Sequence, residues 1–292
     1  MLYEVRMTTT HTYGRAAVGG RHLLRLMPAE IPGVQRMIAG ALDITPRPRE
    51  RYDRVDFFGN RTTGLLFAEA HSEVSFTVRA RVERSPIPDG LDISPTLAGL
   101  RAEIDAWRSL GPDSPHHFLD ASPRVARDPA ISDYAAGITR DCRSVLDAVA
   151  TLNRALNRDM TYDPEATTVG TAPSEAFAAR HGVCQDFSHI MIAGLREIGI
   201  PAGYVSGFLQ TQPPPGQPRL EGADAMHAWV SAWCGRETGW VEFDPTNAIR
   251  VSSDHIVVAR GRDYSDVAPV KGVLWTAGTQ TTDQAVDVIP LG

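Results

Sequence analysis

The chain has 292 residues, a formal net charge of -6 and a hydrophobic content of 42%. This composition is enough for a packed core and argues against a disordered chain, and the length suits one large or two ordinary domains. The mild acidity argues against nucleic-acid binding, because no basic run is present, and no apolar stretch approaches the length of a membrane-spanning helix.

The first ninety residues are predicted to be β structure. Polar and apolar residues alternate over residues 2–7 and again over 73–82. In the second segment the apolar residues would share one face, which is the pattern of a half-buried strand. Gly59 and Asn60 mark a turn between two further strands. We therefore predict an N-terminal β domain over residues 1–90, built as an antiparallel sandwich or barrel.

Helical patterns dominate the middle of the chain. Residues 91–130 are predicted to form a linker and helical connection, with a helical pattern over 95–110. From residue 131 to residue 157 apolar residues recur at helical spacing, which favours a helix with one buried face. A second domain is therefore predicted over residues 131–292.

The next helix is predicted to begin near Cys184 and to end before Gly199, because glycine followed closely by proline is a helix stop signal. The proline-rich residues 210–219 are predicted to form a surface loop. Alternating or apolar runs predict strands over residues 202–209, 225–234, 240–243, 256–259 and 286–290.

The three cysteines are Cys142, Cys184 and Cys234. Such an odd and small set is typical of reduced thiols, and residues 1–14 lack the continuous apolar segment of a signal peptide. We therefore expect a cytoplasmic protein without membrane attachment or a disulfide framework. Cys142 is interpreted as a small buried hydrophobic residue, because it lies one turn before an apolar helical stripe.

Cys184 is the candidate nucleophile, because it would lie in the first turn of a buried helix. A free thiol has a pKa of about 8.5, and a helix N-terminus contributes only about 0.3–1 kcal/mol toward an anion. An imidazolium in contact contributes about 4 kcal/mol at an effective dielectric of 20. The thiol therefore needs a histidine partner, and without one the alternative is a structural buried cysteine. Asp186 would oppose ionisation of the thiol, so we expect its side chain to point elsewhere.

His227 and Asp244 are the candidate partners, since they lie on consecutive strands of a predicted hairpin. Two registers place them on one face. In one they are directly opposite, and in the other they are diagonal, with Trp233 opposite Trp240. A register shifted by one residue would put them on opposite faces and would exclude a catalytic triad.

The chemical roles follow from the residue types. His227 would take the thiol proton and later donate it to the leaving amine, and Asp244 would hold the ring and fix its tautomer. The backbone N–H of Cys184 is one candidate donor to an oxyanion.

Other assignments stay open at this point. His181, His189 and His255 are rival bases, and His181 precedes Cys184 by three residues. His181, Cys184 and His227 also offer ligand types suited to zinc, although no second Cys or His pair completes such a site.

At these residues the chain resembles the bacterial transglutaminase-like superfamily, whose members are also described as candidate cysteine proteases. The β-rich start and the tail over residues 258–269 are also similar to that family. The resemblance rests on three blocks, which are HGVCQDFSH at 181–189, GIPAGYVSGF at 199–208, and HAW at 227–229 together with GWVEFDPTN at 239–247.

The resemblance implies an α+β protein in which an N-terminal β-sandwich or barrel precedes a papain-like catalytic core over residues 131–292. It implies Cys184 as nucleophile, His227 as base and Asp244 as orienting acid. Gly203 is a departure, because many relatives carry arginine there. If that arginine contacts substrate or braces the site, specificity or activity would differ here.

A thioester on Cys184 would react with water or with an amine. Hydrolysis of a peptide or protein amide is the favoured prediction, because selecting an amine over water requires a shielded channel. The alternatives are a true transglutaminase and a non-catalytic peptide-binding module on the same fold. We expect no cofactor and no metal, and the sequence holds no calcium-loop motif. The oligomeric state is not predicted.

Overall fold

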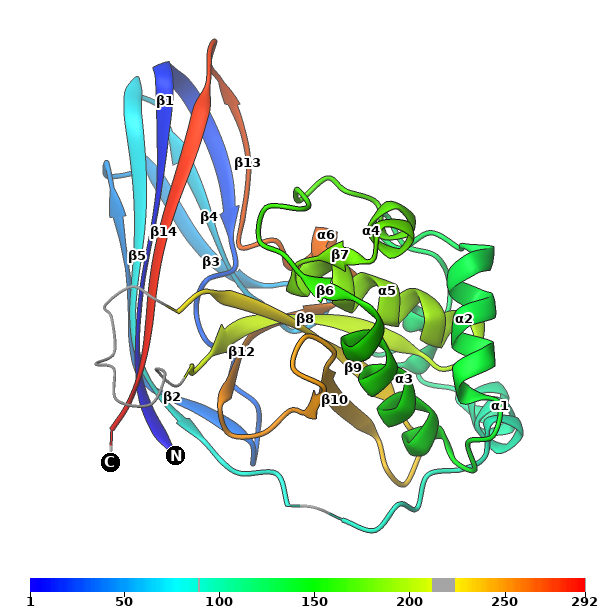
Figure 1. The fold of residues 1–292 in the computed structure, drawn as a ribbon. Coiled ribbons are helices and arrows are strands. Elements are labelled where there is room, and N and C mark those ends of the chain that lie inside the picture. Colours follow the sequence, from blue (N-terminus) through cyan, green and yellow to red (C-terminus); the bar gives the residue numbers. More distant parts are fainter. Residues whose placement is uncertain (89, 212–223, 292) are drawn as a thin grey trace, which may run out of the picture.

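A computed structural model describes residues 1–88, 90–211 and 224–291. A curled antiparallel sheet stands on one side of the molecule, and a mixed helix and strand core stands on the other, as Figure 1 shows. The predicted α+β class is therefore confirmed. Within the described ranges, none of the helices combines the length and the apolar character needed to cross a membrane.

The N-terminal sheet is organised by one long strand, β1. Its first half, Leu2 to Tyr13, pairs with β5 and β14, and its last part, Val18 to Leu24, pairs with β4 and β13. The strand order is β2-β5-β1-β4-β3, with β13 and β14 also on β1. The strands are β1 (Leu2–Leu24), β2 (Gln35–Thr45), β3 (Glu50–Val55), β4 (Arg61–Phe67), β5 (His71–Arg84), β13 (Val270–Trp275) and β14 (Gln280–Pro290).

The alternation of polar and apolar residues explains why this segment forms the half-buried strand β5. The apolar residues predicted to share a face are all buried, namely Val74, Phe76, Val78, Ala80 and Val82. The predicted turn at Gly59 and Asn60 does join β3 to β4, and Gly59 has the positive φ of 84° that favours glycine.

The last strands correct the predicted division of the chain. Residues 270–290 were assigned to the second domain, 131–292, but β13 and β14 return to pair with β1. The strand over 270–275 was not predicted at all. Both strands are mostly exposed, so their sequences carry little apolar alternation and their pairing is set by β1, which lies far away in the sequence.

Helices α2, α3 and α4 pack around α5, which is buried (Figure 1). The segment predicted to be helical over 131–157 is two helices, because Asp128 caps α2 and Ser144 caps α3 through their side chains. The helices are α1 (Leu97–Ala106), η1 (Pro115–Phe118, a 3-10 turn), α2 (Pro129–Thr139), α3 (Val145–Asp159), α4 (Pro173–Ala179), α5 (Cys184–Glu197) and α6 (Tyr264–Val267).

The core sheet is antiparallel, with the order β11-β10-β9-β8-β12. Four of its strands were predicted to within about two residues, while residues 212–219 of the predicted proline-rich loop lie outside the described residues. The strands are β8 (Ala202–Leu209), β9 (Met226–Trp233), β10 (Trp240–Asp244), β11 (Ile249–Arg250) and β12 (His255–Gly261). Strands β6 (Thr161–Tyr162) and β7 (His181–Gly182) form a separate small parallel pair.

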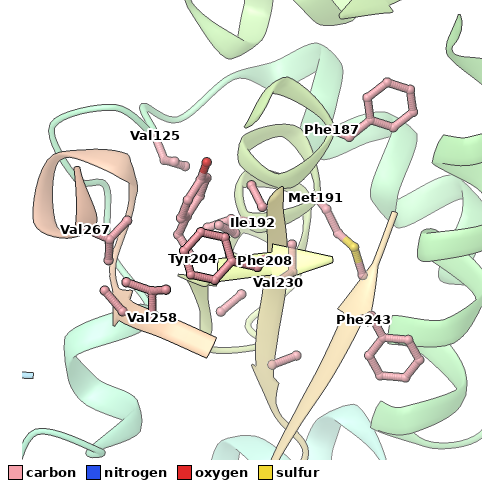
Figure 2. Close-up of a cluster of buried hydrophobic side chains, with 14 of the residues drawn as sticks. Val125, Phe187, Met191, Ile192, Tyr204, Phe208, Val230, Phe243, Val258 and Val267 are labelled. Carbon is pink, nitrogen blue, oxygen red and sulfur yellow. The ribbon is translucent and has the colours of Figure 1, made fainter. Parts of the chain in front are cut away.

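Helix α5 packs against this sheet through a continuous apolar cluster. Figure 2 shows Met191 and Ile192 of α5 over Phe208 of β8 and Val230 of β9. Every residue from Gln185 to Arg196 is buried. Burial of this kind stabilises by about 1.5–3 kcal/mol for each large apolar side chain, so the start of α5 is held firmly in place.

The N-terminal sheet should lose stability in acid because of His22. This side chain is 5% exposed, and burial, together with the neighbouring His11 and His71, lowers its pKa from 6.5 to about 4. The unfolded chain therefore binds the proton more readily. The stability that His22 contributes above pH 6.5 is lost as the pH falls toward 4, on the order of 3 kcal/mol in total.

Calorimetric unfolding temperatures between pH 7.5 and pH 4.5 test this expectation. His22→Leu should flatten the decline toward acid, whereas His181→Leu, at an exposed histidine, should not. An acid decline of the same slope in both variants would show that His22 is not its source.

Candidate active site

Cys184 is the first residue of α5 and is partly exposed to solvent. The start of the helix is capped by Asp186, whose Oδ2 accepts the Val183 N–H at 2.8 Å and the Thr167 hydroxyl at 2.6 Å. The Asp186 carboxylate therefore binds the backbone and Thr167, as expected for a side chain directed away from the Cys184 sulfur. Gly182 permits this cap, because a Cβ there would lie 2.7 Å from the Asp186 side chain.

His227 and Asp244 are brought together by the β9–β10 register. Trp233 pairs with Trp240 and Val230 with Phe243, which is the predicted diagonal register. His227 Nε2 and Asp244 Oδ2 are 2.7 Å apart. Cys184 is among the groups that raise the pKa of His227, so the thiol and the imidazole lie close enough to interact. Because Nε2 is held by Asp244, Nδ1 is the nitrogen that remains for the thiol.

The Asp244 carboxylate is saturated with donors. Oδ1 accepts the backbone N–H groups of Thr246 at 2.9 Å and Asn247 at 3.3 Å, while Oδ2 also accepts the Asn247 amide at 2.7 Å. A second imidazole, His255 Nε2, lies 3.1 Å from the same Oδ2. Asp244 is fully buried, whereas the His227 side chain keeps 11% of its surface exposed, so substrate can reach the histidine but not the carboxylate.

The structure separates the rival histidines. Buried His255 contacts Asp244, and buried His189 accepts the Tyr264 N–H at 3.2 Å, while His181 is exposed. Among the described residues, His227 is the imidazole that both binds Asp244 and has its pKa raised by Cys184.

Sequence reasoning missed the support that His255 gives to Asp244. The signal was weak, because His255 lies on β12, which is separated from β10 in the sheet by β9 and β8. The Trp229 ring packs edge-on against His255 at 5.1 Å between centroids, and its Nε1 donates to Glu242 at 3.0 Å. Gly207 makes room for the indole, since a Cβ there would lie 2.5 Å from it.

The electrostatics of the pair favour a charged imidazole. Burial alone would lower the pKa of His227, but the hydrogen bond to Asp244 and the interaction with Cys184 raise it to about 10. Burial opposes ionisation of Asp244, yet hydrogen bonds from His227 and His255 hold the pKa of Asp244 well below its usual range. The proton between them therefore resides on His227, which makes the ring a cation that faces the Cys184 sulfur.

Two tyrosines near the sulfur also escaped the sequence analysis. Burial and then the negative charge of Cys184 raise the pKa of Tyr162 and of Tyr204. Both hydroxyl groups stay protonated and able to donate a hydrogen bond near the sulfur. Tyr162 is 55% exposed, so it is the one accessible to a bound substrate.

Gly203 lies on β8 beside the ring of Phe118. A Cβ there would lie 2.8 Å from the Gly261 carbonyl oxygen and 2.9 Å from that ring. An arginine at position 203 would therefore require both the Phe118 ring and the Gly261 backbone to move, so glycine fits the local packing here.

One group among the described residues has the spacing of a metal site. The ligand atoms of His227, Asp244 and His255 lie within 4.8 Å of one another. Asp244 Oδ2, however, already receives both imidazoles and the Asn247 amide. The zinc ligands considered from the sequence were His181, Cys184 and His227. The group in the structure keeps His227 but has Asp244 and His255 in place of the other two. The arrangement of these three side chains therefore fits a hydrogen-bonded network better than a catalytic metal centre, which needs an open coordination position.

Comparison with known proteins gives a consistent result over nearly the whole chain. Residues 132–245 match the family model described as transglutaminase-like superfamily, and residues 3–83 match the bacterial transglutaminase-like N-terminal region. All three candidate residues lie within the first match.

Two relatives and one solved structure match this chain along almost its full length. The uncharacterized protein Rv2569c of Mycobacterium tuberculosis is 37% identical over 293 residues, covering 99% of this chain and 90% of the relative. The uncharacterized protein ML0607 of Mycobacterium leprae is 30% identical, covering 97% of each. The crystal structure of a candidate cysteine protease from Cytophaga hutchinsonii superposes with a TM-score of 0.78 at 20% identity, covering 100% of this chain and 91% of that chain. This likeness establishes the fold.

Proposed function

Because the chain belongs to the transglutaminase-like superfamily, we propose that it is a cysteine-nucleophile enzyme that cleaves amide bonds of peptides or proteins by hydrolysis. The observation that carries the proposal is the 2.7 Å hydrogen bond between the His227 imidazole and the Asp244 carboxylate, in a pair whose imidazole pKa is also raised by the neighbouring Cys184. A structural cysteine would not need a cationic, oriented imidazole beside it.

In the first half of the reaction, the Cys184 sulfur attacks the amide carbonyl carbon and a C–S bond forms. His227 donates its proton to the amine nitrogen, the C–N bond breaks and the amine leaves. The negative charge on the carbonyl oxygen develops near the Cys184 N–H, which as the first helical residue has no intrahelical acceptor. The Tyr162 hydroxyl is our candidate for the second donor.

In the second half, water attacks the thioester while His227 takes the water proton, and the acid product leaves as the C–S bond breaks. Asp244 holds the ring in one tautomer throughout, and His255 holds Asp244 from the far side. We place the reaction in the cytoplasm, where the Cys184 thiol stays reduced.

Hydrolysis is preferred to transfer because Cys184 is partly open to solvent. An enzyme that transfers the acyl group to an amine must keep water away from the thioester. The experiment is to incubate the protein with a glutamine-containing peptide and a primary amine, and to follow both products by mass spectrometry. Ammonia or peptide release without amine incorporation supports the proposal, whereas incorporation indicates a transglutaminase and no turnover of any amide indicates a binding module.

A metal-free mechanism predicts a clear response to chelators. Dialysis against EDTA should leave hydrolysis unchanged, because proton transfer at His227 needs no Lewis acid. Added zinc should inhibit, since the partly exposed Cys184 thiol and the His227 imidazole are ligand types that bind zinc and would then be unavailable for catalysis. Loss of activity on chelation, with recovery on adding metal back, would contradict this mechanism.

A further inference from the structure

A cavity of about 380 Å³ lies where the N-terminal sheet meets the core sheet. Its walls come from the N-terminal region, including Ile31, Phe58 and Arg84, and from β8 to β12 of the core sheet. Cys184, His227 and Asp244 are not among its lining residues. A volume of this size falls within the range of about 300–1,000 Å³ that is typical of small-molecule sites.

The unusual feature of this cavity is Arg84. The residue has no exposed surface, and its Nε, Nη1 and Nη2 atoms make no hydrogen bond to any described residue. Glu242 is the carboxylate that most favours the charged form of Arg84, but it is already bound by Arg260 at 2.8 Å and by the Trp229 indole at 3.0 Å. A buried guanidinium with unsatisfied donors is costly, so a polar or anionic partner in the cavity would stabilise it.

The rest of the lining defines what kind of anion fits. Three arginines and two carboxylates line the cavity, which leaves an excess of one positive charge. Most of the remaining surface is apolar and includes the rings of Phe58, Phe118 and Trp240. Gly203 and Ser231 add little bulk on the side of the sheet.

We propose that this cavity is a binding site for a small organic carboxylate, with the carboxylate on the Arg84 guanidinium and an apolar body against Phe58, Phe118 and Trp240. The planar fork of arginine matches a carboxylate in bidentate fashion. An apolar body is required because the walls offer few other polar partners. The site is independent of the proposed amide hydrolysis.

Calorimetric titration of the full chain with 3-phenylpropionate tests the site. The acid should bind in the millimolar range or tighter, whereas the uncharged 3-phenylpropionamide and inorganic phosphate should each bind at least tenfold more weakly. The first comparison isolates the charge, and the second isolates the apolar body. No binding of the acid, or equal binding of the amide or of phosphate, would overturn the proposal.

Substitutions then locate the ligand. Arg84→Met should weaken binding of 3-phenylpropionate by about ten- to a hundredfold, from the loss of charge-assisted hydrogen bonds. Arg79→Met, the same change at an exposed position of β5, should leave binding unchanged. Without ligand, Arg84→Met should unfold at the same or a higher temperature, because it removes a buried unpaired charge.

Arg84→Lys is a milder second variant. Lysine keeps the charge but lacks the planar, bidentate guanidinium, so it should weaken binding less than Arg84→Met. Equal affinity in wild type, Arg84→Met and Arg84→Lys would place the ligand elsewhere and contradict the assignment.

Discussion

Replacing Cys184 with alanine should lower kcat for amide hydrolysis by at least about a thousandfold, because no other group can form the thioester. The unfolding temperature should change little, since Cys184 is partly exposed at the first position of α5 and alanine is a good helix former. Steady-state kinetics and calorimetry on the same preparation check both expectations.

Cys142→Ala is the matched control for this loss. Cys142 is also partly buried, but it lies between α2 and α3, away from the His227 ring, and its substitution should leave kcat within about twofold. If Cys184→Ala keeps a tenth or more of the wild-type rate, the thiol is not the nucleophile and the proposed mechanism fails.

Asp244→Asn should lower kcat by about a hundred- to ten-thousandfold and should also change its pH dependence. In the wild type, the hydrogen bond to Asp244 and the interaction with Cys184 raise the pKa of His227 to about 10 against the effect of burial, so the imidazolium that protonates the amine persists to alkaline pH. Activity should fall only as the pH rises through that value. Without the Asp244 charge the pKa of His227 falls, and the alkaline limb should move to lower pH by one unit or more.

Asp266→Asn is the control for the Asp244 substitution, because Asp266 is a salt-bridged carboxylate held by Arg262. Its pH–rate profile should match that of the wild type. An Asp244→Asn profile that keeps the wild-type alkaline limb, even with a lowered rate, would show that Asp244 does not set the proton affinity of His227.

Local patterns were sufficient to predict the elements that carry the candidate site. The helical stripe that starts at Cys184 and the glycine and proline that follow it bounded α5 correctly. His227 and Asp244 could be paired because they lie on neighbouring strands with a short connection, so that only the register was open.

What the sequence could not supply depends on contacts between distant segments. His255 reaches Asp244 from β12, which is separated from β10 by β8 and β9, and no local pattern encodes this approach. Strands β13 and β14 carry little apolar alternation, so their return to β1 was missed. Arg84 ends an ordinary alternating strand, and its burial becomes apparent only when the core sheet covers it.

The most direct test of the account is the rate of iodoacetamide labelling at each cysteine, resolved by mass spectrometry from pH 5.5 to pH 9. Burial raises the pKa of Cys142, and it raises the pKa of Cys234 to about 12, so these two thiols serve as internal references. The account predicts that Cys184 is alkylated rapidly well below pH 8 and that His227→Gln removes this advantage. Slow labelling of Cys184 below pH 8, at a rate that His227→Gln leaves unchanged, would contradict it.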